Sequence, residues 1–380
     1  PYPAAMLYIL AIPAIVLQVF GVTSPVVILL AYRLVLLAFD VAIFFTLRGL
    51  LTAENSKRLI WLYWLSPVAF YINYVHGQLD VIPIAFVVLA LPLILSGRYV
   101  ASALLLGLAI SAKTSVLLIV PVFLLYCFVR TASVFRTAQF VVVSLLTFLV
   151  LNLPLMRDPA FIDMVLFNQE QAKVFSRFIG FGDVNFQLVL AAWIMLLVLA
   201  LRVGIANRNL FVMFLGFFFC VVLLLIPPMF GWYYWIIPFF AFFFANEKDA
   251  SPVLFLGIQG LYFLYFLVSP NSDYLQVFQV FTTGLPPLGT FYHWLTSVGF
   301  DADLLNDVAF TFLQTALLLL CVQVYRRGIL KYRVQKITGR PFLLGIGGNS
   351  GVGKSRLTDA IEGVFQSENT TVLRGDDRHR

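Results

Sequence analysis

The chain has 380 residues, of which 61% are hydrophobic and 11% charged, whereas a soluble domain typically has roughly 45–50% apolar residues. Together with a mean hydropathy of +0.96, this composition excludes an ordinary soluble protein and indicates a polytopic membrane protein. The formal charge of +7 does not indicate a nucleic-acid partner, because the basic residues lie mostly in short links between apolar segments, where they orient a membrane protein. The three cysteines lie in apolar runs without paired spacing, which predicts neither a disulfide framework nor a zinc site.

Residues 1–325 predict a mainly α-helical transmembrane bundle of about 11–12 hydrophobic helices, each long enough to span or nearly span a bilayer. The predicted segments are approximately 4–20, 26–47, 59–73, 81–96, 99–112, 114–129, 137–156, 188–206, 209–229, 232–246, 251–269 and 309–325. We therefore expect a multi-pass integral protein of the plasma or inner membrane, with the lipid bilayer as a partner.

The distribution of Lys and Arg predicts the orientation of this bundle. Six basic residues follow the last segment between Arg326 and Arg340, while the link 270–308 contains none. Because cytoplasmic links carry the excess of positive charge, the C-terminal segment is expected in the cytoplasm. Alternation then places a second group of links on the extracytoplasmic face: 74–80, Lys113, 157–187, 230–233 and 270–308.

The N-terminal helices raise two open questions. Segment 4–20 is at the lower length limit for a span, and its prolines fit an interfacial helix equally well. In the next helix, Arg33 and Asp40 are seven residues apart and so fall on one face. We interpret them as a polar contact between helices, with a functional role as the alternative.

The stretch from Leu65 to Asp80 interrupts helical structure at Pro67 and Gly77 and gathers His76, Gln78 and Asp80 at a membrane surface. Such an interruption is tolerated only where protein or a cavity covers the backbone. We interpret it as a functional cavity; the alternative is an ordinary loop in which Asp80 caps a helix.

Two further features belong to the same predicted face. Lys113 could pair with a lipid phosphate, or its side chain could extend to the interface. The stretch from Gly231 to Pro238 contains Tyr233 among several aromatic residues. It could be an aromatic belt, although a belt alone does not require Gly231 and Pro238.

In this order, these residues resemble the GT-C class of integral membrane glycosyltransferases, and the resemblance covers roughly residues 1–325. It rests on Tyr2-Pro3, Arg33 with Asp40 and Arg48, Ser66-Pro67 with Gly77 to Asp80, Lys113 with Pro121, and Trp232-Tyr233 with Pro238. The resemblance implies transfer of a sugar from a polyprenyl-phosphate donor on the extracytoplasmic face. It implies that a lipid-sugar site contains His76, Gln78, Asp80, Lys113 and Tyr233. The catalytic carboxylate of that class would lie upstream of Pro1.

A second motif lies near the C-terminus, where Gly348 to Ser355 fits the phosphate-binding pattern G-x-x-x-x-G-K-[ST]. The expected strand precedes it at 341–346 and the expected helix follows at 355–365. The predicted ATP-binding residues are Gly348, Asn349, Ser350, Gly351, Val352, Gly353, Lys354 and Ser355. Lys354 is expected to reach the β- and γ-phosphates and Ser355 to hold Mg²⁺. The alternative is a glycine-rich turn that matches by chance.

After this helix, a second predicted strand at 370–374 ends in Gly375-Asp376-Asp377-Arg378-His379-Arg380. With the phosphate-binding loop, this ending resembles the phosphoribulokinase/uridine kinase family over about residues 341–380. The resemblance implies that Asp376 is the base that accepts a proton from a small-molecule hydroxyl, with Lys354 as the second catalytic residue. Arg378 departs from the aromatic residue usual in the family. The alternative for Asp376 and Asp377 is a polar turn after a strand.

We therefore predict three parts: a GT-C-like membrane domain (1–325), a basic cytoplasmic linker (326–340) and the start of a P-loop α/β kinase domain (341–380). Both domains are expected to be truncated, because the glycosyltransferase base and most of the kinase are missing. One alternative is a transporter or lipid flippase with an energising or regulatory P-loop domain. Another is a membrane region that only anchors the kinase.

Overall fold

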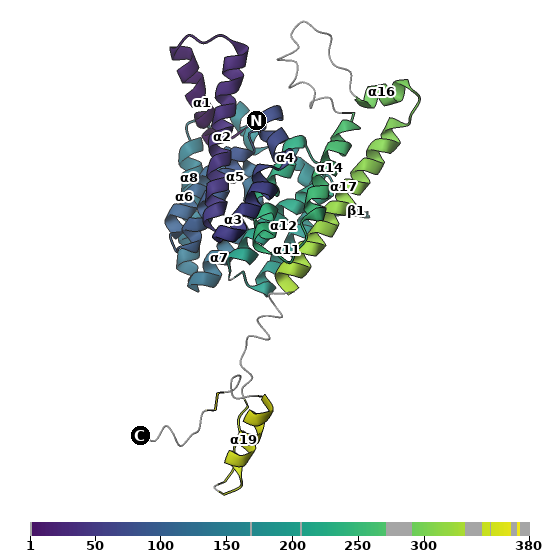
Figure 1. Cartoon of the computed structure of the whole chain (residues 1–380). Coiled ribbons are helices and arrows are strands. Elements are labelled where there is room, and N and C mark those ends of the chain that lie inside the picture. Colours follow the sequence, from purple (N-terminus) through teal and green to yellow (C-terminus); the bar gives the residue numbers. More distant parts are fainter. Residues whose placement is uncertain are drawn as a thin grey trace. The chain divides into compact units, whose positions relative to one another are not determined.

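The computed structural model describes residues 2–167, 169–205, 207–270, 291–330, 344–349, 351–365 and 371–372. The chain divides into two compact units, Pro1–Lys331 and Tyr332–Arg380. The first is a bundle of helices, and the described part of the second contains α19 (Lys354–Phe365) (Figure 1). The predicted strand at 341–346 is not seen among the described residues, because 344–346 have no regular secondary structure.

The helices of the first unit follow the predicted apolar segments closely. They are α1 (Ala4–Val19), α2 (Pro25–Gly49), α3 (Ala53–Leu59), η1 (Ile60–Trp64), α4 (Pro67–Phe70), η2 (Tyr71–His76), α5 (Val81–Leu95), α6 (Tyr99–Ala112), η3 (Thr114–Ile119), α7 (Val120–Thr131), α8 (Val134–Asn152), α9 (Pro159–Phe161), η4 (Ile162–Leu166), α10 (Gln169–Ala172), η5 (Lys173–Phe175), α11 (Leu188–Val203), α12 (Arg208–Leu225), η6 (Phe230–Trp235), α13 (Ile237–Asn246), α14 (Val253–Leu267), α16 (Phe291–Ser297), α17 (Ala302–Tyr325) and η8 (Arg326–Leu330). Two short strands, β1 (Phe178–Phe181) and β2 (Val184–Gln187), form a hairpin.

Five helical stretches in the described chain are long and apolar enough to cross a membrane: Pro25–Gly49, Thr114–Thr131, Val134–Asn152, Arg208–Leu225 and Ala302–Leu330. Five shorter apolar helices accompany them. The prediction of an apolar helical bundle is thus confirmed, and its association with a lipid bilayer follows from these helices.

The core of the bundle lies around α12 and α13. Almost every residue of these two helices is buried, and their phenylalanine rings interlock. Gly216 makes this close packing possible, because a Cβ at that position would lie 2.8 Å from the Phe240 ring. In contrast, few residues of α2 and α8 are buried, as expected of helices that face lipid.

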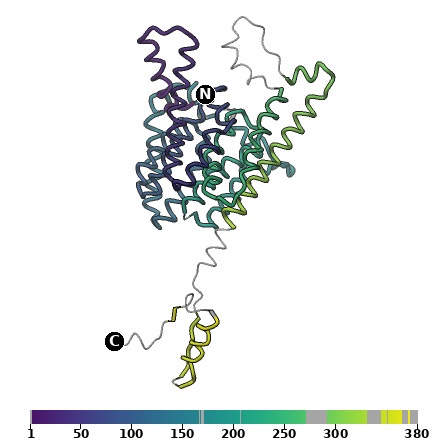
Figure 2. The backbone as a smooth tube through the Cα atoms, viewed as in Figure 1, coloured from purple at the N-terminus to yellow at the C-terminus, as the bar shows by residue number. Residues whose placement is uncertain are grey.

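The helices α1 and α2 form an arm that extends beyond one end of the bundle (Figure 2). This end is here called the Asp80 end, because Gly77 and Leu79 line a groove together with residues of α1 and α2. At the base of the arm, the backbone N–H of Ala4 donates to Asn152 Oδ1 at 2.9 Å and that of Ala5 donates to Ser111 Oγ at 3.2 Å. These side chains satisfy two of the N–H groups that a helix N-terminus leaves without partners.

The predicted span at 59–73 is broken, as the sequence indicated. Pro67 lacks an N–H and cannot continue the preceding helix. The Ser66 hydroxyl restarts the helix by accepting from the Ala69 N–H, and it also donates to Gln259 Oε1 at 2.8 Å. Gly77 then ends η2 in the left-handed conformation, with φ of +79°.

A buried polar cluster ties α2 to this broken segment. The Asp40 carboxylate accepts hydrogen bonds from the hydroxyls of Tyr63, Tyr74 and Tyr234, the last two at 2.6 and 2.9 Å. The Tyr63 and Tyr234 hydroxyls are also 2.6 Å apart. The arrangement fits the interpretation of Asp40 as a polar contact between helices.

We expect Asp40→Ala to destabilise the bundle, because it leaves three hydroxyls without their shared acceptor at a cost of about 1–3 kcal/mol for a buried group. Tyr74→Phe removes one donor and should have a smaller effect. Thermal unfolding in detergent measures both. An Asp40→Ala protein that unfolds at the wild-type temperature would show that the cluster does not hold the helices together.

Candidate functional site

The segment 76–80 connects η2 to α5 at the Asp80 end of the bundle. Its shape depends on Gly77, because a Cβ there would lie 1.4 Å from Nη1 of Arg33. The guanidinium therefore lies directly over the Gly77 backbone, and its Nη2 donates to the carbonyl of Val75 at 3.0 Å. No residue larger than glycine fits this contact or the positive φ.

The carboxylate of Asp80 is buried and forms an ion pair with Lys113, the residue that ends α6. Its side chain makes no capping hydrogen bond to α5, so the capping alternative is wrong. The second carboxylate oxygen, Oδ2, is buried and has no hydrogen-bond partner among the described residues. Asp80 is thus held by one charge and keeps one oxygen available to a donor.

Two aromatic rings complete the surroundings of Lys113. Its Nζ is 5.0 Å from the centre of the Trp235 ring and 5.9 Å from that of Tyr2. Both distances fit cation–π attraction. Burial, and to a lesser extent the Asp80 carboxylate, raise the pKa of Tyr2, so its phenol stays neutral.

Gly231 of η6 closes the cluster from the other side. A Cβ at this position would lie 2.6 Å from Asp80 Oδ2 and 3.0 Å from Cγ of Gln78. The absence of a side chain therefore allows η6 to approach the 76–80 segment. This contact explains why a glycine stands at the start of a run of aromatic residues.

The structure brings four of the five predicted lipid-sugar residues together. His76 stacks on Phe230 at 5.4 Å between ring centres, Gln78 and Asp80 contact Gly231, and Lys113 pairs with Asp80. Tyr233 is the exception. It is buried with its ring edge-on to Tyr262 on α14, at 5.3 Å between ring centres.

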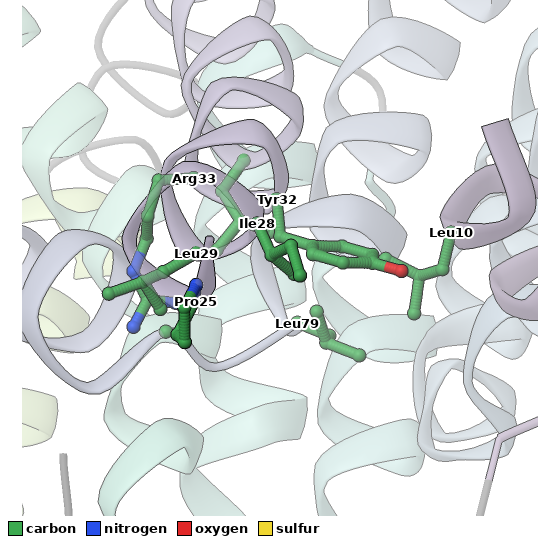
Figure 3. Close-up of a pocket in the computed structure, with 9 residues that line it drawn as sticks. Leu10, Pro25, Ile28, Leu29, Tyr32, Arg33 and Leu79 are labelled. Atoms are coloured by element: carbon green, nitrogen blue, oxygen red, sulfur yellow. The ribbon is translucent and has the colours of Figure 1, made fainter. Parts of the chain in front are cut away.

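An open groove of about 520 Å³ lies beside this cluster, between α1, α2 and the 76–80 segment (Figure 3). Its walls are mostly aliphatic, and its lining residues are Leu10, Pro25, Ile28, Leu29, Tyr32, Arg33, Leu36, Gly77 and Leu79. Figure 3 shows the Arg33 guanidinium and the Tyr32 hydroxyl on opposite sides of these aliphatic side chains. The groove therefore combines an apolar wall with one cation.

Arg33 and Trp235 are the members of this site that sequence reasoning assigned elsewhere. Arg33 makes the expected structural contact, through its hydrogen bond to Val75 of η2, but it also lines the groove. Its Nε is buried without a hydrogen-bond partner in the described chain. Trp235 was considered only as part of an aromatic belt. Arg33 could have been found from its position about one helical turn after Leu29 and two turns after Pro25, at the apolar start of α2.

The second unit contains the predicted phosphate-binding motif. Gly351 and Gly353 have φ of +85° and +86°, the left-handed region that the motif requires. The loop leads directly into α19, whose first turn carries Lys354 and the exposed Ser355. Lys354 Nζ donates to the carbonyl oxygens of Gly348 at 2.7 Å and Asn349 at 2.8 Å.

The ammonium group of Lys354 thus lies over the loop that leads into the N-terminus of α19. Both the positive charge and the N–H groups of a helix N-terminus attract phosphate. Val352 lies within contact distance of Gly348, since a Cβ on that glycine would be 3.0 Å from Val352 Cγ2. Ser350 and Asp376 lie outside the described residues.

Neither the family models nor the curated sequences compared with the chain match it. The functional interpretation therefore depends on the residues and their geometry.

We expect Gly231→Ala to disrupt the Asp80 cluster, because the added methyl group would overlap Asp80 Oδ2. Overpacking of this kind typically costs about 1–3 kcal/mol. Gly257→Ala on α14 is the matched control, since its Cβ would meet nothing within 4 Å. Thermal unfolding of the two purified variants should show a loss only for Gly231→Ala; equal midpoints would contradict the close approach of η6 to Asp80.

Proposed function

We propose that the membrane unit is a glycosyltransferase that uses a polyprenyl-phosphate sugar as donor. The observation that carries this proposal is the buried Oδ2 of Asp80, a carboxylate oxygen without a hydrogen-bond donor beside a groove that holds a cation. A buried acceptor of this kind is costly unless a ligand or water donates to it. Sugar hydroxyl groups are suitable donors.

The two cations of the site have different roles in this proposal. Lys113 is neutralised by Asp80 and serves to hold the carboxylate in place. Arg33 has no carboxylate partner among the described residues, and it can bind a phosphate diester through charge-assisted hydrogen bonds. The aliphatic wall of the groove then accepts the first isoprene units of the lipid.

Within the reaction, these residues bind and orient the donor. A phosphate at Arg33 and a sugar at Asp80 fix the two sides of the bond that breaks, and fixed geometry lowers the entropic part of the barrier. The sugar's C1–O bond breaks, the acceptor oxygen bonds to C1, and the polyprenyl phosphate leaves. The acceptor's proton passes to a base that we do not assign to a residue of this chain.

We expect Arg33→Gln to weaken binding of polyprenyl phosphate about tenfold or more, since a charge-assisted hydrogen bond contributes about 1.5–3 kcal/mol. Arg208→Gln is the matched control, because Arg208 also donates to a backbone carbonyl, that of Leu50, but outside the groove. Native mass spectrometry can count bound polyprenyl phosphate and uncharged polyprenol on each purified protein.

The same proteins in membranes, given a donor with a radiolabelled sugar, should transfer label to a second product. Arg33→Gln should lose both binding and transfer, while Arg208→Gln keeps them. If wild-type protein binds the lipid and moves it across vesicles without transferring the sugar, the transporter or flippase alternative is correct. Equal lipid binding by the two variants would show that Arg33 is not the phosphate site.

For the second unit we propose an ATP-dependent kinase of the phosphoribulokinase/uridine kinase type. The supporting observation is Lys354 folded over a loop whose two glycines have positive φ, directly before α19. Lys354 would bind the β- and γ-phosphates, and the Ser355 hydroxyl, exposed on the first turn, would hold Mg²⁺. The metal ion would neutralise charge on the phosphates.

In the proposed reaction, a hydroxyl oxygen of a sugar or nucleoside attacks the γ-phosphorus, and the bond to the β,γ-bridging oxygen breaks to release ADP. Asp376 accepts the proton of the attacking hydroxyl. Lys354 and the loop N–H groups stabilise the charge that develops on the phosphoryl oxygens.

We expect Lys354→Ala in the full-length protein to weaken both ATP·Mg²⁺ binding and phosphoryl transfer. Arg356→Ala removes an exposed cation two residues later on α19 and should change neither. Asp376→Asn should keep ATP binding and lower transfer by roughly 10²–10⁴-fold, as loss of a general base does. Calorimetric titration with ATP and a phosphoryl-transfer assay separate the two effects. Unchanged transfer by Asp376→Asn would show that Asp376 is not the base. The second unit would then be a nucleotide-binding domain with no support for a kinase of this family.

A further inference from the structure

The link between α8 and α11 contains a β-hairpin that the proposed functions do not use. Its strands pair in the register Phe178↔Gln187, Ile179↔Phe186, Gly180↔Asn185 and Phe181↔Val184. Gly182, at the first of the two turn positions, has φ of +62°, as a tight two-residue hairpin turn requires. The pairing therefore fixes which side chains share a face.

The two faces of the hairpin differ in chemistry. Because side chains alternate along a strand, Ile179, Phe181, Val184 and Phe186 share one face, and Phe178, Gly180, Asn185 and Gln187 share the other. The four residues of the first face are all apolar and are 49%, 63%, 67% and 50% exposed, respectively. The described chain thus leaves this apolar face largely uncovered.

The covering partner can be inferred from what adjoins the hairpin. Strand β2 leads without a break into α11, and the Leu188 N–H donates to the Arg177 carbonyl at 3.0 Å, which extends the pairing to the helix. Helix α11 exposes a row of large apolar side chains: Leu190, Ile194, Met195, Val198 and Leu201. In a membrane-embedded bundle such a row faces lipid. Because β2 runs directly into α11, the hairpin adjoins that lipid-facing surface.

The depth of the hairpin follows from its backbone. A two-stranded sheet has two edges whose N–H and C=O groups need partners, and the hydrocarbon core supplies none. The headgroup region does supply water and polar groups. There, the exposed Arg177 could contact lipid phosphates while Asn185 faces water. Figure 1 shows β1 at the flank of the bundle.

We propose that this hairpin is an interfacial membrane anchor, which inserts Ile179, Phe181, Val184 and Phe186 among the upper acyl chains and keeps Asn185 in water. The anchor holds the link between α8 and α11 against the bilayer surface. Burial of apolar side chains in the acyl region provides the driving force.

Nitroxide labels on single cysteines test this in proteoliposomes, with the native cysteines replaced by alanine. Phe186→Cys and Asn185→Cys are neighbours that point to opposite faces. Met195→Cys, on the exposed row of α11, provides the lipid-facing reference, and Arg356→Cys on α19 provides the water-facing one. Collisions with oxygen report hydrocarbon, and collisions with a water-soluble nickel chelate report water.

The label at 186 should resemble that at 195, with many oxygen and few nickel collisions, and the label at 185 should resemble that at 356. A label at 186 as accessible to nickel as that at 185 would show that the hairpin lies in water. A label at 186 shielded from both reagents would show a protein partner, such as a second copy. Either result overturns the proposal, and the labels at 195 and 356 calibrate the collision rates expected in lipid and in water.

Discussion

The ion pair between Asp80 and Lys113 is the constraint on which the site depends. Moving an ionised carboxylate into an apolar interior costs several kcal/mol even after the protein relaxes. The lysine offsets part of that cost only at close contact, and close contact requires the start of α5 to meet the end of α6. Gly231 then allows η6 to cover the pair, and Trp235 faces the ammonium group. The arrangement of three chain segments thus follows from the need to neutralise one buried charge.

Much of the bundle could be predicted, because the features that define it are local. Apolar length determines where a helix can cross a bilayer, and the observed helices begin and end close to the predicted segments. Pro67 and Gly77 interrupt a helix through their own backbone chemistry, so the break between α3 and α5 could also be predicted from the sequence. The alternation of basic links grouped Asp80, Lys113 and Gly231 on one predicted face, and the structure brings these three residues into contact.

Other features depend on packing between distant segments and could not be predicted. Nothing in the run of aromatic residues distinguishes Trp235, which faces Lys113, from Tyr233, which packs against Tyr262. The position of Arg33 over Gly77 depends on the angle between α2 and the broken segment. The hairpin was predicted only as part of a link, although Ile179, Phe181, Val184 and Phe186 show the required alternation. Its strands are four residues each, too short to be distinguished by pattern from an irregular apolar link.

The unequal pairing of Lys113 and Arg33 also determines how a phosphorylated lipid sugar could lie in the site. A phosphate near Asp80 would meet a carboxylate that is already paired with Lys113, and two like charges in a poorly solvated site repel strongly. A phosphate at Arg33 meets a guanidinium that has no acidic partner in the described chain and keeps one N–H free of protein acceptors. A neutral sugar hydroxyl has the opposite preference, because Asp80 Oδ2 can accept from it without repulsion. The electrostatics of the 76–80 segment therefore favour one orientation of the ligand, with the phosphate on the Arg33 side and the sugar on the Asp80 side.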